Sequence, residues 1–137
     1  MREILFRGKK ICDSKWVIGN YNAPLPTNWG ATIEDAINIP NLAYSVDPDT
    51  VGQYTGLTDK NGKQIFEGDI IKAKIEGGNH EGFTWPNMRV EFEQGAFCLV
   101  YGEHNRLCNF NGLAPSVSLE VIGNIHDNPN LLETEEK

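Results

Sequence analysis

Hydrophobic and polar residues alternate with a period of two over much of the chain, and glycine interrupts the pattern at short intervals. The clearest case is residues 69–76, where Ile71, Ala73 and Ile75 face one side of a strand and charged residues face the other. Side chains of a strand point to opposite faces in turn, so the chain is predicted to be mainly β, built from antiparallel hairpins. Further strands are predicted over residues 3–7, 15–19, 42–46, 50–58, 88–93 and 118–125.

Three segments depart from simple alternation. Residues 96–101 are apolar on both faces, which predicts a strand in the interior of a sheet or one at a junction between layers. Residues 32–37 begin with Thr32 as a potential N-cap and carry two acids in the first turn, which predicts a short helix. Asn61-Gly62 predicts a type I′ hairpin turn, because both central positions of that turn need positive φ.

A domain boundary is predicted near residue 67. It would separate an N-terminal β-rich subdomain with an irregular loop, residues 1–66, from a C-terminal subdomain with an acidic tail, residues 67–137. Gly68-Asp69 enters an alternating strand in the way that is common in small barrels, so a small SH3-like barrel is expected in the C-terminal half by analogy of fold. The alternative is that the two halves behave as one domain.

The charge balance argues against nucleic-acid binding. The 137 residues include 12 Lys and Arg against 19 Asp and Glu, a net charge of −7, and the longest basic run is Lys9-Lys10. A duplex-binding protein gains most of its affinity from cations that face phosphates. Neither a secretory signal nor the roughly 20 apolar residues of a membrane-spanning helix is found in the sequence, so no membrane contact is expected.

The three cysteines, Cys12, Cys98 and Cys108, are odd in number and widely spaced. This spacing fits no disulfide framework, which predicts free thiols and a cytoplasmic location. It also lacks the ligand spacing of a zinc site, and no nucleotide-binding fingerprint occurs. No metal and no cofactor are therefore expected.

One pair of carboxylates invites a catalytic interpretation, since Glu67 and Asp69 flank Gly68. Paired carboxylates can perform acid–base chemistry. Acids around a glycine turn more often accept hydrogen bonds from the backbone of the turn itself. No catalytic residue is assigned on this basis, and the chain is expected not to be an enzyme. An enzyme whose site the sequence does not disclose stays as an alternative.

A long central segment resembles the YopX family of phage and prophage proteins. The segment runs from residue 45 to 72 and reads SVDPDTVGQYTGLTDKNGKQIFEGDIIK; residues 2–10 and 119–129 are similar to the same family. The resemblance implies a mostly β, multimeric protein of phage or prophage origin, and it implies no established activity, catalytic residue or cofactor. Structural roles are expected for Gly52, Gln53, Tyr54, Thr55, Gly56, Asp59, Gly62, Glu67, Gly68 and Asp69.

Large apolar side chains in two predicted loops, residues 20–31 and 77–88, either fold back on the core or meet another chain, and an interface is expected. Loops normally lie on the surface, and aromatic residues and Met are enriched at interface centres. The candidate interface residues are Trp29, Phe83, Trp85 and Met88. The expected function is a non-enzymatic interaction module of a phage or prophage that forms a homo-oligomer and contacts host or phage proteins. The other alternative is a small-barrel factor associated with nucleic acid, which the charge disfavours.

Overall fold

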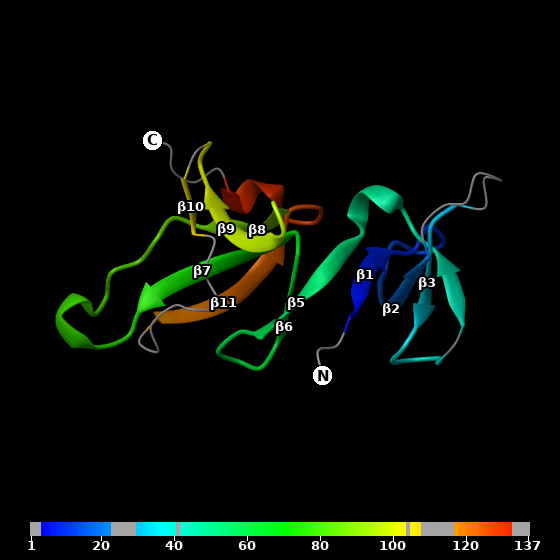
Figure 1. Ribbon diagram of the computed structural model, residues 1–137, viewed down its shortest axis with the longest axis horizontal. Coiled ribbons are helices and arrows are strands. Elements are labelled where there is room, and N and C mark those ends of the chain that lie inside the picture. The colour runs from blue at the N-terminus through cyan, green and yellow to red at the C-terminus, as the bar shows by residue number, and fades with distance from the viewer. Residues whose placement is uncertain (1–3, 23–29, 41, 104, 108–116, 133–137) are drawn as a thin grey trace. The chain divides into compact units, whose positions relative to one another are not determined.

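The computed structural model describes residues 4–22, 30–40, 42–103, 105–107 and 117–132 (Figure 1). The chain divides into two compact units, Met1–Gly56 and Leu57–Lys137. Both are built from antiparallel strands, and the described residues contain only short 3-10 turns besides them, so the mainly β prediction is confirmed. The predicted boundary after residue 66 lies inside the second unit.

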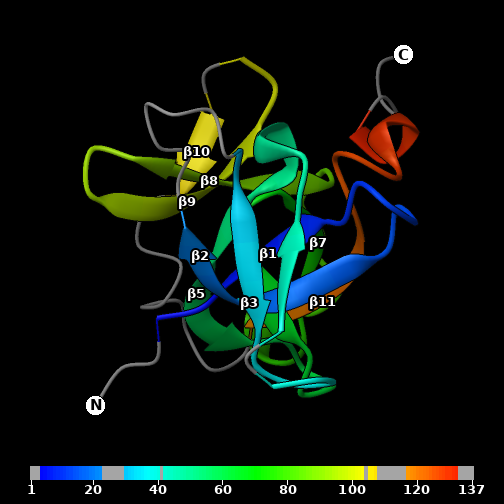
Figure 2. The same ribbon diagram turned by 90° about the vertical axis from the view of Figure 1, so that its right-hand side faces the viewer.

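The first unit is an antiparallel sheet with the strand order β4-β3-β2-β1-β5. Figure 2 labels β1, β2, β3 and β5 of this sheet. Strand β5 continues into the second unit, where it pairs with β6. A 3-10 turn, η1 (Pro48–Thr50), precedes β5. The strands are β1 (Phe6–Lys9), β2 (Trp16–Asn22), β3 (Thr32–Asp35), β4 (Ala43–Ser45) and β5 (Gly52–Thr58).

The helix predicted over residues 32–37 is wrong, because Thr32–Asp35 forms strand β3 between β2 and β4. Ile33 and Asp35 are both buried with the period of two that a strand requires. Asp35 does not occupy a helical first turn. Its side chain instead accepts backbone hydrogen bonds just beyond the strand. Pairing with two neighbouring strands and burial of Ile33 outweigh the local capping pattern.

The core of the first unit is small and depends on close backbone approach. Its buried members are Val17, Ala31, Ile33 and Val46. A Cβ on Gly19 would lie 1.7 Å from the backbone carbonyl oxygen of Glu34, so β2 and β3 can pair only with glycine at this position. The partly buried residues around this core are Phe6, Tyr21, Tyr44 and Val51.

The second unit contains a five-stranded antiparallel sheet with the order β10-β9-β8-β7-β11. Strands β7 and β11 run side by side along its length (Figure 1). The interior position predicted for residues 96–101 is confirmed, because β9 lies between β8 and β10. The elements are β6 (Gln64–Phe66), β7 (Asp69–Ile75), η2 (Gly78–His80), β8 (Met88–Glu93), β9 (Ala96–Tyr101), β10 (Asn105–Leu107), β11 (Val117–Asn124) and η4 (Pro129–Leu132).

The predicted SH3-like barrel does not close. In the part of the chain that the structure describes, no ladder joins β10 to β11, so the sheet is open. The outer edge of β11 is instead covered by the turn after β5, where the Lys60 N–H donates to the Leu119 carbonyl at 2.9 Å. The Gly-Asp entry into β7 is present as expected, but a local turn does not determine whether a sheet closes.

Both faces of the second sheet are covered in its middle. Ile65, Ile71, Met88 and Leu99 are fully buried in the main core, together with Ala73 and Val90. On the alternate positions of β7 and β9, Ile70, Cys98 and Val100 are also fully buried.

The prediction that all thiols are free is wrong for Cys98. This residue lies fully buried in β9 and is disulfide-bonded, whereas Cys12 is an exposed free thiol. Cys108 lies outside the described residues. Spacing in the sequence does not reveal which cysteines a sheet brings into bonding distance, because the bond depends on Cα separations of roughly 4.4–6.8 Å in the fold.

The turn at Asn61-Gly62 is not of the predicted type. Gly62 has a φ of +83°, but Asn61 does not have positive φ, and the Gly62 N–H donates to the Asp59 carbonyl. This is a type I turn followed by a left-handed glycine, not the predicted type I′ turn. The two-residue loop with positive φ at both positions is Gln94-Gly95, between β8 and β9.

Candidate functional site

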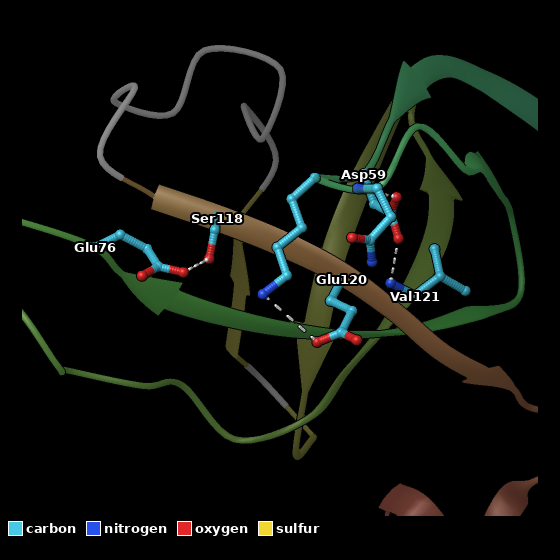
Figure 3. A network of polar contacts seen from close by, with 7 residues as sticks. Asp59, Glu76, Ser118, Glu120 and Val121 are labelled. Carbon is cyan, nitrogen blue, oxygen red and sulfur yellow. Dashed lines mark hydrogen bonds and ion pairs between the residues drawn. The ribbon is translucent and has the colours of Figure 1, made fainter.

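The YopX-like segment places Asp59 directly after β5, where the side chain is 7% exposed. One carboxylate oxygen, Oδ1, accepts the backbone N–H groups of Asn61 and Lys63, each at 2.9 Å. The other, Oδ2, accepts the N–H of Val121 in β11 at 2.9 Å (Figure 3). A single carboxylate therefore closes the turn after β5 and fastens it to β11.

Hydrogen bonding sets the ionisation of Asp59. Burial alone would raise its pKa, but the backbone N–H groups of Val121, Lys63 and Asn61 outweigh that effect and lower the pKa below its usual value. The carboxylate is therefore ionised at neutral pH and its acceptor positions are occupied by the chain. A general base needs a pKa near the working pH and access to a substrate proton. Asp59 has the properties of a structural carboxylate.

Solvent-exposed polar contacts surround this junction in Figure 3. The Lys60 ammonium lies 3.9 Å from a carboxylate oxygen of Glu120, and both side chains are about two-fifths exposed. The Ser118 hydroxyl donates to a carboxylate oxygen of Glu76 at 3.0 Å, across the β7–β11 pair. Exposed pairs of this kind contribute little to stability. The buried Asp59 hydrogen bonds are the interactions that hold the turn.

The carboxylate pair considered for catalysis forms a second tight turn. Asp69 is 1% exposed, and its Oδ2 accepts the N–H of Phe66 at 2.8 Å. Gly68 has a φ of +94°, and its N–H donates to the Val90 carbonyl while its own carbonyl accepts from Ile125. The turn between β6 and β7 is thus tied to β8 and to the residue after β11. This geometry supports a structural role for Gly68 and Asp69.

The remaining motif residues follow strand β5. In the first unit, Gly52 and Gln53 pair with β1, and the Tyr54 N–H donates to the Leu5 carbonyl at 2.8 Å. Thr55 is buried. Gly56 has a φ of +91°, a left-handed conformation that favours glycine, at the last residue of the first unit.

The four candidate interface residues occupy different environments. Met88 is fully buried in the core, because it lies on the inward face of β8 next to Ile71 of β7, so it offers no surface contact. Trp85 is partly buried against the same core and contacts the ring of Phe83 edge to face, with centroids 5.0 Å apart. Phe83 is 52% exposed. Trp29 lies outside the described residues.

The largest group of exposed apolar side chains lies elsewhere and was missed in the sequence. Ile37, Ile39 and Leu42, in the loop between β3 and β4, are 58%, 53% and 43% exposed, and Ile11 is 67% exposed. This group was not predicted, because a helix was expected over residues 32–37. A sequence signal does exist, because three large aliphatic residues within six positions around Pro40 follow neither a helical nor a strand period.

An open hollow of about 430 Å³ lies in the first unit beside the turn between β1 and β2. The Lys10 ammonium is 3.3 Å from a carboxylate oxygen of Asp13 and 4.4 Å from the centre of the Tyr44 ring. Lys10 is thus engaged by groups of the chain itself, and the lining mixes both signs of charge. The lining residues are Lys9, Lys10, Ile11, Ser14, Asp47 and Pro48.

In the described ranges of the chain, no group of three His, Cys, Asp or Glu side chains is placed to hold a metal ion. No helix within these ranges is long and apolar enough to cross a membrane.

Three comparisons with known proteins bear on this geometry. The chain is similar to a solved structure described as protein EF1440 from Enterococcus faecalis, with 24% identity and a TM-score of 0.60 over 97% of this chain and 100% of that one. That likeness shows a shared fold. No curated protein matches the chain. The family described as YopX protein matches residues 2–133, which include every motif residue discussed above. The chain therefore belongs to the YopX family.

Proposed function

We propose that this chain is a phage- or prophage-encoded, non-enzymatic protein-interaction module that acts in the host cytoplasm and self-associates. The observation that carries the proposal is the exposure of large apolar side chains on the first unit. These are Ile4, Ile11, Ile37, Ile39 and Leu42, and the last three share the loop between β3 and β4. Scattered single apolar residues are normal on a protein surface, but a group of them marks an interaction site. The family resemblance supports the phage or prophage setting.

The carboxylates of the motif support the non-enzymatic part of the proposal. Asp59 and Asp69 accept backbone hydrogen bonds within the fold, and neither side chain is more than 7% exposed. A catalytic site needs titratable groups that converge on an accessible pocket. The hollow of the first unit contains Lys10 already paired with Asp13, and neither Asp59 nor Asp69 lines it.

The test is the mass of the purified chain in solution, measured by size exclusion with light scattering at tens of micromolar protein. The proposal expects a multiple of the 15.3 kDa chain mass. A mass of 15.3 kDa at every concentration contradicts self-association. Capture from phage-infected host cells, with the tagged full chain as bait, then identifies a host or phage protein partner.

A nucleic-acid role is separated from a protein-interaction role by retention on heparin or single-stranded DNA. Binding through phosphates weakens steeply as salt rises. With a net charge of −7, the chain is expected to pass through both columns at low salt. Salt-dependent retention would favour the nucleic-acid alternative over the proposal.

A further inference from the structure

The turn after β5 exposes the pair Asn61-Gly62 and fixes its own backbone by hydrogen bonds. Asn61, Gly62 and the residue on either side of them are exposed. The Gly62 N–H donates to the Asp59 carbonyl at 2.9 Å. The N–H groups of Asn61 and Lys63 each donate to Oδ1 of the Asp59 carboxylate at 2.9 Å. The Asp59 N–H donates to the Lys63 carbonyl, and the Lys60 N–H donates to β11. The backbone of an exposed turn is thus closed at every residue.

An Asn-Gly pair carries an intrinsic reaction that needs no enzyme and no cofactor. The Gly62 backbone nitrogen loses its proton to base and bonds to the side-chain carbonyl carbon of Asn61. The side-chain amide nitrogen leaves as ammonia, and a cyclic imide remains. Water then opens the ring at either carbonyl carbon and leaves aspartate or isoaspartate at position 61. A Cβ on Gly62 would meet no other part of the chain within 4 Å, so the surrounding structure leaves room for the ring.

The closed turn opposes this reaction. The proton that the Gly62 nitrogen must lose is the one that it donates to the Asp59 carbonyl. Ring closure also requires the peptide group between Asn61 and Gly62 to rotate until the nitrogen faces the side-chain carbonyl carbon. That rotation breaks the Gly62 bond and disturbs the bonds of Asn61 and Lys63 to the Asp59 carboxylate. Attack on the side chain therefore requires local opening of the turn.

We propose that Asn61 is a latent deamidation site and that Asp59 keeps it unreactive by holding the turn closed. One carboxylate carries this protection, because Oδ1 accepts two N–H groups of the turn and Oδ2 accepts the N–H of Val121 in β11. The rate of modification in the folded chain is the rate in the open chain multiplied by the fraction of time that the turn is open. Deamidation of Asn61 therefore reports the opening of the turn between β5 and β6.

The modification persists after the turn closes again. Isoaspartate routes the main chain through the former side chain and lengthens it at position 61. The N–H groups of Gly62 and Lys63 then no longer reach their acceptors on Asp59 together. Either product also adds a carboxylate close to that of Asp59, and like charges oppose each other's ionisation. Chains modified at this position are expected to unfold at a lower urea concentration than unmodified chains.

The test follows the modification in the full-length wild type, in native buffer and in guanidinium chloride at the same mildly alkaline pH. Chymotrypsin cleaves after Leu57 and Phe66, and the peptide between these cuts, residues 58–66, contains Asn61 as its only asparagine. The other Asn-Gly pair, residues 111–112, lies outside this peptide and outside the described residues. Mass spectrometry gives the deamidated fraction, and chromatography separates isoaspartate from aspartate. A sample taken at time zero corrects for modification during digestion.

Two variants of the full chain test the role of Asp59 in native buffer. Asp59→Ala removes the acceptor of the turn and of Val121. Glu120→Ala is the matched control, because it removes only the exposed contact with Lys60 beside the same turn. Circular dichroism verifies that both variants keep the β-rich spectrum. If Asp59→Ala does not fold, Asp59→Ser takes its place, since a single hydroxyl oxygen replaces only part of the carboxylate.

Deamidation of the wild type is expected to be about tenfold or more slower in native buffer than in guanidinium chloride. Asp59→Ala should be faster than the wild type in native buffer, and Glu120→Ala should match the wild type. Equal rates in the native and the denatured wild type would overturn the protection. An unmodified Asn61 in the denatured chain would overturn the site itself. A folded Asp59 variant that reacts as slowly as the wild type would overturn the role of Asp59.

Discussion

The two units of the chain stabilise themselves in different ways. The second unit buries Ile65, Ile71, Met88 and Leu99 with two smaller residues, and partly buries seven more hydrophobic residues around them. The first unit buries Val17, Ala31, Ile33 and Val46 and surrounds them with four. The second unit also carries most of the charge, with seven Lys or Arg against thirteen Asp or Glu, whereas the first is nearly neutral.

The two units also differ in how many large hydrophobic side chains they expose. Among the described residues, five of the seven exposed large hydrophobic side chains belong to the first unit, and the other two are Phe83 and Phe92. Burying apolar area stabilises a unit by roughly 25 cal/mol per Å², so a unit with a small core gains more from a partner that covers its surface. The comparison indicates that the second unit has the larger core, and it supports the proposal that the first unit is the part that meets other proteins.

The largest loss of stability is expected for Gly19→Ala, in the first unit. The new Cβ would lie 1.7 Å from the Glu34 carbonyl oxygen, and a backbone atom cannot yield as a side chain can. We expect a loss of about 3 kcal/mol or more in unfolding free energy, above the usual cost of overpacking. Amide hydrogen exchange should accelerate at β2 and β3 but not at Val121 of the second unit.

Asn20→Ala is the control for this substitution, because Asn20 is the exposed neighbour of Gly19 on the same strand. Its hydrogen exchange should match that of the wild type. Equal acceleration in both units of Gly19→Ala would contradict the independence of the second unit and favour a chain that unfolds as one domain.

Asp59→Ala applies the corresponding test to the second unit. The substitution leaves the N–H groups of Asn61, Lys63 and Val121 without their carboxylate acceptor. Unsatisfied buried donors cost about 1–3 kcal/mol, more when a charged partner is lost, so we expect a loss near 3 kcal/mol in urea unfolding. Glu120→Ala removes only the exposed 3.9 Å pair with Lys60 and should change stability by less than about 0.5 kcal/mol. Equal losses in the two variants would contradict the structural role of Asp59.

Acid should weaken both units, because each is held by a carboxylate with a lowered pKa. For Asp35, burial acts to raise the pKa, but hydrogen bonds from the N–H groups of Ile37 and Asn38 outweigh this effect and lower it. The pKa of Asp59 is lowered in the same way. A folded pKa below the unfolded one, about 3.9, stabilises the protein above that pH. Stability is lost as the pH falls from about 4 through the folded pKa.

Urea midpoints measured between neutral pH and the acid range check this expectation. Asp59→Asn cannot be ionised, so its midpoint should fall less steeply below pH 4 than that of the wild type. Asn20→Ala changes no titratable group, so its urea midpoint should fall with pH in the same way as that of the wild type. A wild-type midpoint that stays constant down to acid unfolding would contradict both lowered pKa values.

Sequence reasoning was reliable where a pattern is local and failed where the fold decides. Period two located β7 and β8, because alternation in a strand is a property of the segment itself. The helix prediction for the β3 segment is wrong, since pairing with two other strands does not appear in its own residues. For the candidate site, Asp59 was named but its bond to Val121, 62 positions away, was not predictable. For the same reason, the predicted barrel closure was wrong and the Cys98 disulfide was not predicted.

Gly62→Ala tests the structural role expected for this motif glycine. Gly62 has a φ of +83°, and a Cβ there would meet nothing within 4 Å, so the cost comes from the left-handed backbone alone. We expect a loss of about 1 kcal/mol, observed as a lower melting temperature. Gly62→Asn should recover part of it, because asparagine tolerates this conformation better than alanine. An unchanged melting temperature in Gly62→Ala would contradict the strained geometry.

The smallest expected effect is a gain in stability. It concerns the hairpin between β8 and β9, which has the kind of turn that the sequence predicted at Asn61-Gly62. Gln94 has a φ of +52° and precedes Gly95 at +84°, in the two-residue loop between β8 and β9. Asparagine is favoured at this first position of a type I′ turn, whereas glutamine is not. Gln94→Asn should therefore raise the unfolding free energy by about 0.5 kcal/mol, read from the urea midpoint. Gln64→Asn, in strand β6, should give no such gain, since asparagine is disfavoured in strands. A lower midpoint in Gln94→Asn would mean that the β8–β9 hairpin does not use this turn.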